Sequence, residues 1–271
     1  MPESRPAPVT VPVVRAAKRR SGYDALVMVT AYDAPGARLA DAAGVDLILV
    51  GDSVGNTVLG YENSLQVTVE DMAHHTAAVA RARPKPLIVA DLPWLSYHLD
   101  PADTVRNAAV LIRAGAQAVK LEGGANRVPM IEALVSAEIP VMGHLGLTPQ
   151  SVHVMGGFRV QGKDDAAAHA LELGAKAIQA AGCFAVVLEG VPETVGRAIT
   201  DALDVPTIGI GAGPDCDGQV LVFHDLLGFS EKVPKFVRRY AELGATATEA
   251  LARYAADVRS GSFPSDAETY H

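Results

Sequence analysis

Residues 44–52 read Gly44-Val-Asp-Leu-Ile-Leu-Val-Gly-Asp52, a glycine followed by a short apolar run that ends in a carboxylate. The same layout returns at residues 115–122 and 182–189, which end in Glu122 and Glu189. A glycine commonly follows the last turn of a helix, and a short run that is apolar on both faces is typical of a parallel strand covered by helices. The repeat therefore indicates β-α units in which an acidic side chain stands at the C-terminal end of the strand.

Further runs of this kind extend the pattern along the chain. The predicted strands are Leu26–Thr30, Asp46–Val50, Leu87–Ala90, Ala118–Leu121, Val141–Gly143, Ala185–Leu188, Thr207–Ile210 and a weaker eighth at Gln219–Phe223. Alanine-rich helical stretches lie between them, for example residues 101–114, 127–137 and 166–181. Seven or eight such units in about 200 residues predict an α/β fold, a (β/α)8 TIM barrel. A doubly wound open sheet is the alternative, and it usually uses fewer strands.

The length of 271 residues suits one barrel domain, since such barrels typically take about 250 residues. We expect the domain to span residues 11–271, with helices after Gly228 that finish the barrel and pack outside it. Residues 1–10 are rich in proline and polar groups, and we expect a disordered extension there. The two cysteines, Cys183 and Cys216, lie far apart in the sequence and are expected to be reduced thiols.

Charge and hydropathy argue against two classes of partner. The net charge of −8 is opposite in sign to the basic face that nucleic-acid binding requires. The basic cluster Lys18-Arg19-Arg20 is interpreted as a solvated charge run. No apolar run reaches the roughly 18 residues of a membrane span, and the N-terminus lacks an apolar signal core. We therefore expect a cytoplasmic protein that binds neither nucleic acid nor membrane.

Seven polar side chains stand at or just beyond the ends of five predicted strands. They are Asp52, Ser53, Asp91, Lys120, Glu122, His144 and Glu189. Singly, each has a structural interpretation: Asp91 before Leu-Pro suits a turn, and His144 suits a packed histidine. Lys120 is harder to explain in this way, because a lysine is almost never fully buried unless it is paired. Since a barrel needs no such acids for stability, the set predicts an active site at the C-terminal face of the barrel.

The residue types at this face indicate metal-assisted chemistry. The carboxylates of Asp52, Asp91 and Glu122 are hard oxygen ligands, which suit Mg²⁺ or Mn²⁺ better than zinc. Such a metal can chelate the carboxylate and keto oxygens of a 2-oxo acid and stabilise the enolate formed beside them. Lys120 and His144 can add positive charge or hydrogen-bond donors at the same oxygens. We therefore expect enolate chemistry on a 2-oxo acid.

The remaining acid and two glycine-rich segments complete the expected site. Glu189 lies on a different strand and is the candidate base for removing a proton beside the carbonyl. The long connection Leu145–Lys163 has the character of a lid or binding loop. The segment Gly209–Gly213 follows a late strand and lacks the acidic partner of a dinucleotide site, so we interpret it as a substrate-facing turn.

At these positions the sequence resembles the ketopantoate hydroxymethyltransferases. The segments that carry the resemblance are Gly51–Gly55, Ala90–Pro93, Val119–Gly124, Gly143–Gln150, Gly156–Phe158, Gln161–Lys163, Leu188–Glu189, Ile208–Gly213 and Pro234–Phe236. They occur in the right order over roughly residues 10–265, which makes the match more specific than any single motif.

The resemblance implies an activity and an assembly. It implies transfer of a hydroxymethyl group from 5,10-methylenetetrahydrofolate to 3-methyl-2-oxobutanoate through a Mg²⁺-stabilised enolate, which gives 2-dehydropantoate in pantothenate and coenzyme A biosynthesis. It also implies a barrel of the phosphoenolpyruvate/pyruvate type and a large homo-oligomer, often a decamer.

The resemblance further implies a role for each of the seven polar residues. Asp52 and Asp91 would bind Mg²⁺, with Glu122 in or next to its shell, and Glu189 would accept the proton. The residues expected to surround the 2-oxo acid are Asp52, Ser53, Asp91, Lys120 and His144.

Three other function classes share parts of this pattern. A type I aldolase would use Lys120 as a Schiff-base nucleophile, although the neighbouring carboxylates oppose this. A Mg²⁺-dependent carbon–carbon lyase of the same barrel superfamily would need no folate. A non-catalytic barrel that binds a metabolite or a partner has no reason to keep a base together with metal ligands.

Overall fold

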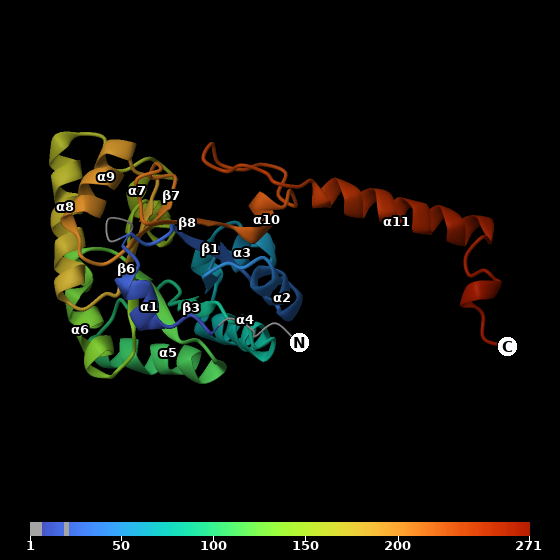
Figure 1. Ribbon diagram of the computed structural model, residues 1–271, viewed down its shortest axis with the longest axis horizontal. Helices are drawn as coiled ribbons and strands as arrows, with labels where there is room; N and C mark the ends of the chain where they lie inside the picture. Colours follow the sequence, from blue (N-terminus) through green and yellow to red (C-terminus); the bar gives the residue numbers. More distant parts are fainter. Residues whose placement is uncertain (1–6, 19–21) are drawn as a thin grey trace. The chain divides into compact units, whose positions relative to one another are not determined.

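The structure is a computed structural model that describes residues 7–18 and 22–271. The chain divides into two compact units, Met1–Val222 and Phe223–His271. The first unit contains a closed barrel of eight parallel strands, β1 to β8, in which β1 pairs with β8 (Figure 1). This closure confirms the predicted TIM barrel and excludes the open doubly wound sheet, because an open sheet has two unpaired edges.

The eight strands lie close to their predicted positions. They are β1 Leu26–Thr30, β2 Leu47–Val50, β3 Leu87–Asp91, β4 Ala118–Glu122, β5 Val141–Gly146, β6 Ala185–Glu189, β7 Thr207–Ile210 and β8 Gly218–Leu221. Four predicted strands ended too early, because the apolar pattern stops where backbone pairing still continues. Asp91, Glu122, His144 and Glu189 therefore belong to the strands themselves. The eighth strand was predicted too long, since Phe223 begins a helix of the second unit.

Helices and short 3-10 turns precede and connect the strands of the first unit. They are α1 Val11–Ala16, α2 Ala34–Ala42, α3 Val54–Thr57, η2 Ser64–Gln66, α4 Val69–Arg81, α5 Pro101–Ala114, η3 Ala125–Arg127, α6 Val128–Ser136, η4 Pro149–Ser151, α7 Val152–Met155, α8 Asp165–Ala180 and α9 Glu193–Ala202. Local signals set their ends. Helix α5 starts where the side chain of Asp100 accepts from the N–H of Asp103, and it stops at Gly115, whose φ is 115°. Residues 101–114, 127–137 and 166–181 were thus predicted to within one residue.

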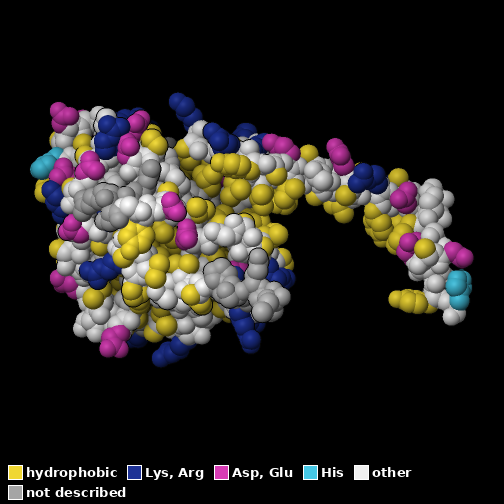
Figure 2. Space-filling model, in the orientation of Figure 1, with side chains coloured by type: hydrophobic (Ala, Val, Ile, Leu, Met, Phe, Trp, Pro, Cys, Tyr) yellow, Lys and Arg dark blue, Asp and Glu magenta, His cyan; other side chains and the backbone are white. Residues whose placement is uncertain are grey.

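The second unit contains α10 (Phe223–Leu226), α11 (Leu243–Ser260) and η5 (Asp266–Glu268). Helix α11 buries none of its residues within the chain, and Leu251, Tyr254 and Val258 are exposed on it. Hydrophobic side chains are visible along this unit in Figure 2. The predicted single domain over residues 11–271 and the packing of these helices outside the barrel stay predictions. Within the described ranges, we find no helix with the length and apolar character of a membrane span.

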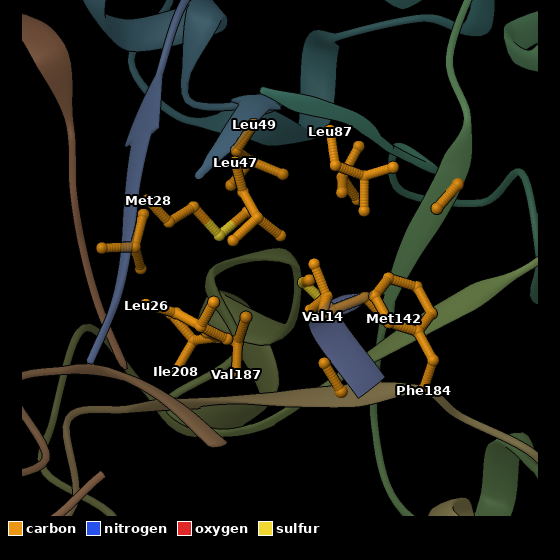
Figure 3. Packing of buried hydrophobic residues seen from close by; sticks show 14 of the residues in the cluster. Val14, Leu26, Met28, Leu47, Leu49, Leu87, Met142, Phe184, Val187 and Ile208 are labelled. Carbon is orange, nitrogen blue, oxygen red and sulfur yellow. The ribbon is translucent and has the colours of Figure 1, made fainter. Parts of the chain in front are cut away.

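The apolar core fills the N-terminal half of the barrel. Val14 of α1 is fully buried among inward-facing side chains such as Leu26, Met28 and Leu47 (Figure 3). The N–H of Val9 donates to the carbonyl of Lys85 at 2.9 Å, while residues 1–6 of the predicted extension lie outside the described residues. Helix α1 therefore closes this end of the barrel.

Lys18, which follows α1, is buried, so the prediction of a solvated charge run is wrong for this residue. Only 4% of it is exposed, and its ammonium donates to Asp217 Oδ2 at 2.7 Å and to the carbonyl of Thr200 at 2.8 Å. Asp217 Oδ2 also accepts from the backbone N–H of Thr207. The pattern of three consecutive basic residues suggested a solvated run, but tertiary pairing buries the first of them. Arg19 and Arg20 lie outside the described residues.

Candidate active site

Strand periodicity places most of the predicted site on the inside of the barrel. The core occupies inward positions 87 and 89 of β3, 118 of β4, 142 of β5, and 185 and 187 of β6. Since alternate residues of a strand share a face, the next inward positions toward the C-terminal ends are Asp91, Lys120, Glu122, His144 and Glu189. Asp52 and Ser53 join them from the turn after β2.

All seven predicted residues line one cavity at this end of the barrel. Asp52, Asp91, Lys120, Glu122 and His144 are at most 6% exposed. Ser53 and Glu189 are half-buried. The same cavity is also lined by apolar side chains, which are Leu49, Val187, Ile210, Val220 and Val222. A small ligand with both a charged and a hydrocarbon part fits such a lining.

Asp91 and Lys120 form a buried ion pair across neighbouring strands. They are direct partners in the β3–β4 register, and Lys120 Nζ lies 2.8 Å from Asp91 Oδ1. Burial opposes the charge on Lys120, but Asp91, Glu122 and Asp52 outweigh it and raise the pKa of the lysine above its ordinary value. The ammonium is therefore a permanent cation of the site at neutral pH.

His144 stands between two carboxylates from its neighbouring strands. Its Nε2 lies 3.3 Å from Glu189 Oε2, and its Nδ1 lies 3.3 Å from Glu122 Oε1. Burial and the nearby Lys120 ammonium oppose protonation, but Glu122 and Glu189 outweigh them and raise the pKa of His144 to about 9. These carboxylates thus favour a protonated imidazole at neutral pH, while the Lys120 ammonium lies 3.2 Å from the same Nδ1.

The carboxylates differ in charge because their surroundings differ. Burial, followed by repulsion from Asp91 and Glu122, raises the pKa of Asp52 to about 8. Burial also raises the pKa of Asp91 despite its ion pair with Lys120. For Glu122, burial is outweighed by His144, by Lys120 and by the N–H of Gln150, which together lower its pKa. The site has an excess of buried acids, which a cation would relieve.

The residues present fit a Mg²⁺ ion held by two carboxylates. In the described part of the chain, no group of three or more His, Cys, Asp and Glu side chains is already gathered for a metal. Mg²⁺ usually takes one or two carboxylates and completes its shell with water and substrate oxygens. Asp52 and Asp91 are neighbours, since the N–H of Asp52 donates to Asp91 Oδ2 at 3.1 Å. Glu122 is already engaged by His144 and by the N–H of Gln150, at 3.1 Å for the latter.

Three polar residues of the site were not predicted from the sequence. The hydroxyl of Tyr32 lies 2.8 Å from Ser53 Oγ, and applying the strand-end rule to β1 as well would have found it. Gln150 ends the segment Gly143–Gln150, in which only His144 was expected to act, and its amide donates to Asp52 at 2.9 Å. The hydroxyl of Tyr97 accepts from the N–H of Glu122. No sequence signal marks Tyr97, which comes from the connection between β3 and α5.

The predicted loop Leu145–Lys163 is partly ordered secondary structure. Strand β5 runs to Gly146, and η4 and the four-residue α7 follow. Gly146 has a φ of 94°, and a Cβ there would collide with the carbonyl oxygen of Glu189. A glycine is therefore required beside the candidate base, whereas the closing of a lid stays a prediction.

Comparison with known proteins identifies the family. The family model described as Ketopantoate hydroxymethyltransferase matches residues 8–266. The chain belongs to this family. As a member it falls among the hydroxymethyltransferases, which confirms the resemblance seen in the sequence motifs.

Relatives of this family member match its sequence over almost the whole chain. It is 57% identical over 262 residues to the 3-methyl-2-oxobutanoate hydroxymethyltransferase of Methylobacterium sp. (strain 4-46), which covers 96% of this chain and 90% of that protein. It is 52% identical over 265 residues to the enzyme of that name from Pelobacter propionicus (strain DSM 2379 / NBRC 103807 / OttBd1), at 97% coverage of both.

Solved structures with a similar fold are far more distant in sequence. Phosphonopyruvate hydrolase in complex with oxalate and Mg²⁺ has a TM-score of 0.62 at 14% identity, covering 97% of this chain and 92% of that one. A trigonal crystal form of 2,3-dimethylmalate lyase, a member of the PEP mutase/isocitrate lyase superfamily, has a TM-score of 0.62 at 18% identity, covering 98% and 90%. These similarities show the barrel fold alone.

Proposed function

We propose that the chain transfers a hydroxymethyl group from 5,10-methylenetetrahydrofolate to 3-methyl-2-oxobutanoate, with Mg²⁺ as cofactor, in pantothenate biosynthesis. Besides membership of the family, one observation supports the proposal: all seven predicted site residues line one cavity. That cavity holds a permanent cation, a protonatable imidazole, two neighbouring carboxylates for a metal and a further acid that is partly open to solvent.

The polar and apolar residues that line the cavity match the two ends of the 2-oxo acid. The Ser53 hydroxyl, the Lys120 ammonium and the His144 imidazole supply donors for the carboxylate and keto oxygens. The branched hydrocarbon end would lie against Leu49, Val187 and the other apolar lining residues. The site therefore supports a small, branched 2-oxo acid as substrate.

The chemistry of the proposed reaction follows from these positions. Bound at Asp52 and Asp91, Mg²⁺ would polarise the substrate oxygens and make the proton on C3 more acidic. The Glu189 carboxylate takes that proton, and Lys120 and His144 stabilise the negative charge on the enolate oxygen. Water adds to the methylene carbon of the folate as one carbon–nitrogen bond breaks, and a proton of the water goes to the released nitrogen. The C3 enolate then bonds to that carbon as the second carbon–nitrogen bond breaks, and the second nitrogen takes up the proton held by Glu189. The hydroxyl of the new hydroxymethyl group therefore comes from water, and tetrahydrofolate leaves.

The site geometry weighs against the alternatives. A Schiff-base mechanism needs a neutral lysine, but Lys120 is paired with Asp91 and surrounded by carboxylates that keep it charged. Failure of borohydride to trap substrate on Lys120 would agree with this. A carbon–carbon lyase would use the same enolate chemistry without a folate, so dependence of turnover on folate separates the two activities. A non-catalytic barrel would show no turnover in either assay.

Deuterium exchange at C3 of 3-methyl-2-oxobutanoate tests the enolate half of the proposal. In D₂O with Mg²⁺ and tetrahydrofolate, NMR should show loss of the C3 proton at a rate proportional to enzyme, and EDTA should stop the loss. Exchange that persists at full rate in EDTA would remove the metal from the mechanism. Absence of exchange with metal present would point to another substrate.

Mg²⁺ binding should depend on pH because Asp52 must lose a proton. The pKa of this carboxyl is raised to about 8 in the metal-free site, so the carboxylate form is half populated at pH 8, predominates about one pH unit higher, and is lost as the pH falls. We expect the Mg²⁺ dissociation constant to rise by up to about tenfold per pH unit as the pH falls from 8 to 6, and to level off above about pH 9. Calorimetry in buffers of different ionisation enthalpy should also detect proton release near pH 7, whereas a flat profile from pH 6 to 9 would contradict the assignment.

We also propose that the enzyme is a cytoplasmic homo-oligomer, a decamer by resemblance. The exposed apolar side chains on α11, with Leu251, Tyr254 and Val258 at helical spacing, support burial against another copy. The buried thiols of Cys183 and Cys216 agree with a reducing compartment. Sedimentation velocity tests the assembly, and a species of about 28.2 kDa, the mass of one chain, would contradict it.

A further inference from the structure

Gln150 occupies a buried position from which it reaches several strand ends at once. It lies in η4 after β5 and is 4% exposed. Its amide Nε2 donates to Asp52 Oδ2 at 2.9 Å and to the carbonyl of Leu92 at 3.0 Å. Its backbone N–H donates to Glu122 Oε2 at 3.1 Å. One residue thus connects the ends of β2, β3 and β4 to the loop after β5.

The orientation of this amide is determined by its partners. Asp52 Oδ2 and the carbonyl of Leu92 act here as acceptors, so the NH₂ end of the amide must face them. On the other side, Gln150 Oε1 lies 2.6 Å from the hydroxyl of Tyr97. That hydroxyl already accepts from the N–H of Glu122 at 3.1 Å, so its own hydrogen points to Gln150. The amide has a single orientation that satisfies the whole network.

Tyr97 is itself held firmly in the site. It is 1% exposed, and the guanidinium of Arg127 lies 5.2 Å from the centre of its ring. Arg127 Nε also donates to the carbonyl of Glu122 at 3.4 Å. The phenol is therefore a fixed donor, and rotation of the Gln150 amide would leave buried polar groups unsatisfied.

We propose that Gln150 is a positioning residue of the metal site, and that Tyr97 acts through it by locking its amide. This inference rests on the proposed binding of Mg²⁺ at Asp52 and Asp91. A neutral amide suits the task, because it orients a carboxylate with a hydrogen bond and adds no charge to a site already rich in acids. Removing a hydrogen bond to a metal ligand typically lowers the affinity for the metal by about 10- to 100-fold.

The test compares Mg²⁺ dissociation constants by titration calorimetry at 15 °C for the wild type, Gln150→Leu and Tyr97→Phe. We expect Gln150→Leu to raise the constant about tenfold or more, and Tyr97→Phe to raise it by a smaller factor. The double variant should resemble Gln150→Leu, because Tyr97 acts through the same amide. Gln179→Leu is the matched control, since Gln179 accepts from backbone N–H groups of Asp204 and Val205 far from the site. It should lower thermal stability and leave Mg²⁺ binding unchanged.

The outcomes separate this inference from the proposed function. Wild-type binding of Mg²⁺ with an unchanged constant in both variants would overturn the positioning role and leave the metal site in place. Absence of binding to the wild type would overturn the metal site and the positioning role together. If Gln150→Leu does not fold, the Mg²⁺ dissociation constant of Tyr97→Phe alone tests the positioning role, because phenylalanine keeps the packing of the ring. Strictly additive effects in the double variant would overturn the action of Tyr97 through Gln150.

Discussion

Replacing Glu189 by glutamine should lower kcat by about 10²- to 10⁴-fold, the usual contribution of a positioned general base. The amide keeps the size of the side chain and a hydrogen-bonding group beside His144 Nε2, which lies 3.3 Å from the wild-type carboxylate. It cannot accept a proton, so both turnover and C3 deuterium exchange should fall together. Mg²⁺ affinity and the KM for the 2-oxo acid should change by less than about threefold, because Glu189 lies on β6, away from Asp52 and Asp91.

Glu193→Gln is the matched control for this variant. Glu193 begins α9 four residues further along the chain, and its carboxylate is paired with Arg197 at the surface at 3.2 Å. Its loss should leave kcat unchanged. Near-normal turnover of Glu189→Gln would remove this residue from the role of base and leave the deprotonation of C3 to another group of the cavity.

Replacing Lys18 by methionine should lower stability strongly without affecting catalysis. The ammonium is 4% exposed and pairs with Asp217, whose side chain is 2% exposed. Removing one partner of a buried pair leaves an uncompensated charge and typically costs about 3–5 kcal/mol. For a chain of this size we expect the melting temperature to fall by roughly 6–15 °C. Since the pair lies at the N-terminal ends of the strands, kcat and Mg²⁺ affinity at 20 °C should stay within about twofold.

Lys176→Met is the matched control for the loss of a lysine. Lys176 forms a surface pair with Glu172 at 2.6 Å on α8, and half of its side chain is exposed. Such pairs contribute at most about 1 kcal/mol, so its melting temperature should change by a few degrees at most. Equal melting temperatures for the two lysine variants would contradict a stabilising role of the Lys18–Asp217 pair.

The barrel and most of its active site follow from patterns that are local in the sequence. A strand that is apolar on both faces occupies only a few consecutive residues, and its side chains alternate with a period of two. Reading where each apolar run ends was therefore enough to locate Asp91, Lys120, Glu122, His144 and Glu189. Closure of the barrel then brings these ends to one face, whichever strand each residue comes from. The same reasoning stopped the strands too early, because a polar residue ends the pattern but not the backbone pairing.

Only the tertiary structure decided which polar groups from distant parts of the chain meet. The contact between Gln150 and Asp52 spans 98 residues, and the one between Lys18 and Asp217 spans 199. Both depend on the path of loops and on barrel closure, for which the sequence has no periodic signal. The protonation states also depend on the folded chain. Burial and repulsion from neighbouring acids raise the pKa of Asp52, whereas Glu122 and Glu189 raise the pKa of His144 against the effect of burial. A residue's local context predicts its place on a strand, whereas its partners and charge depend on groups that only the folded chain brings within a few ångströms.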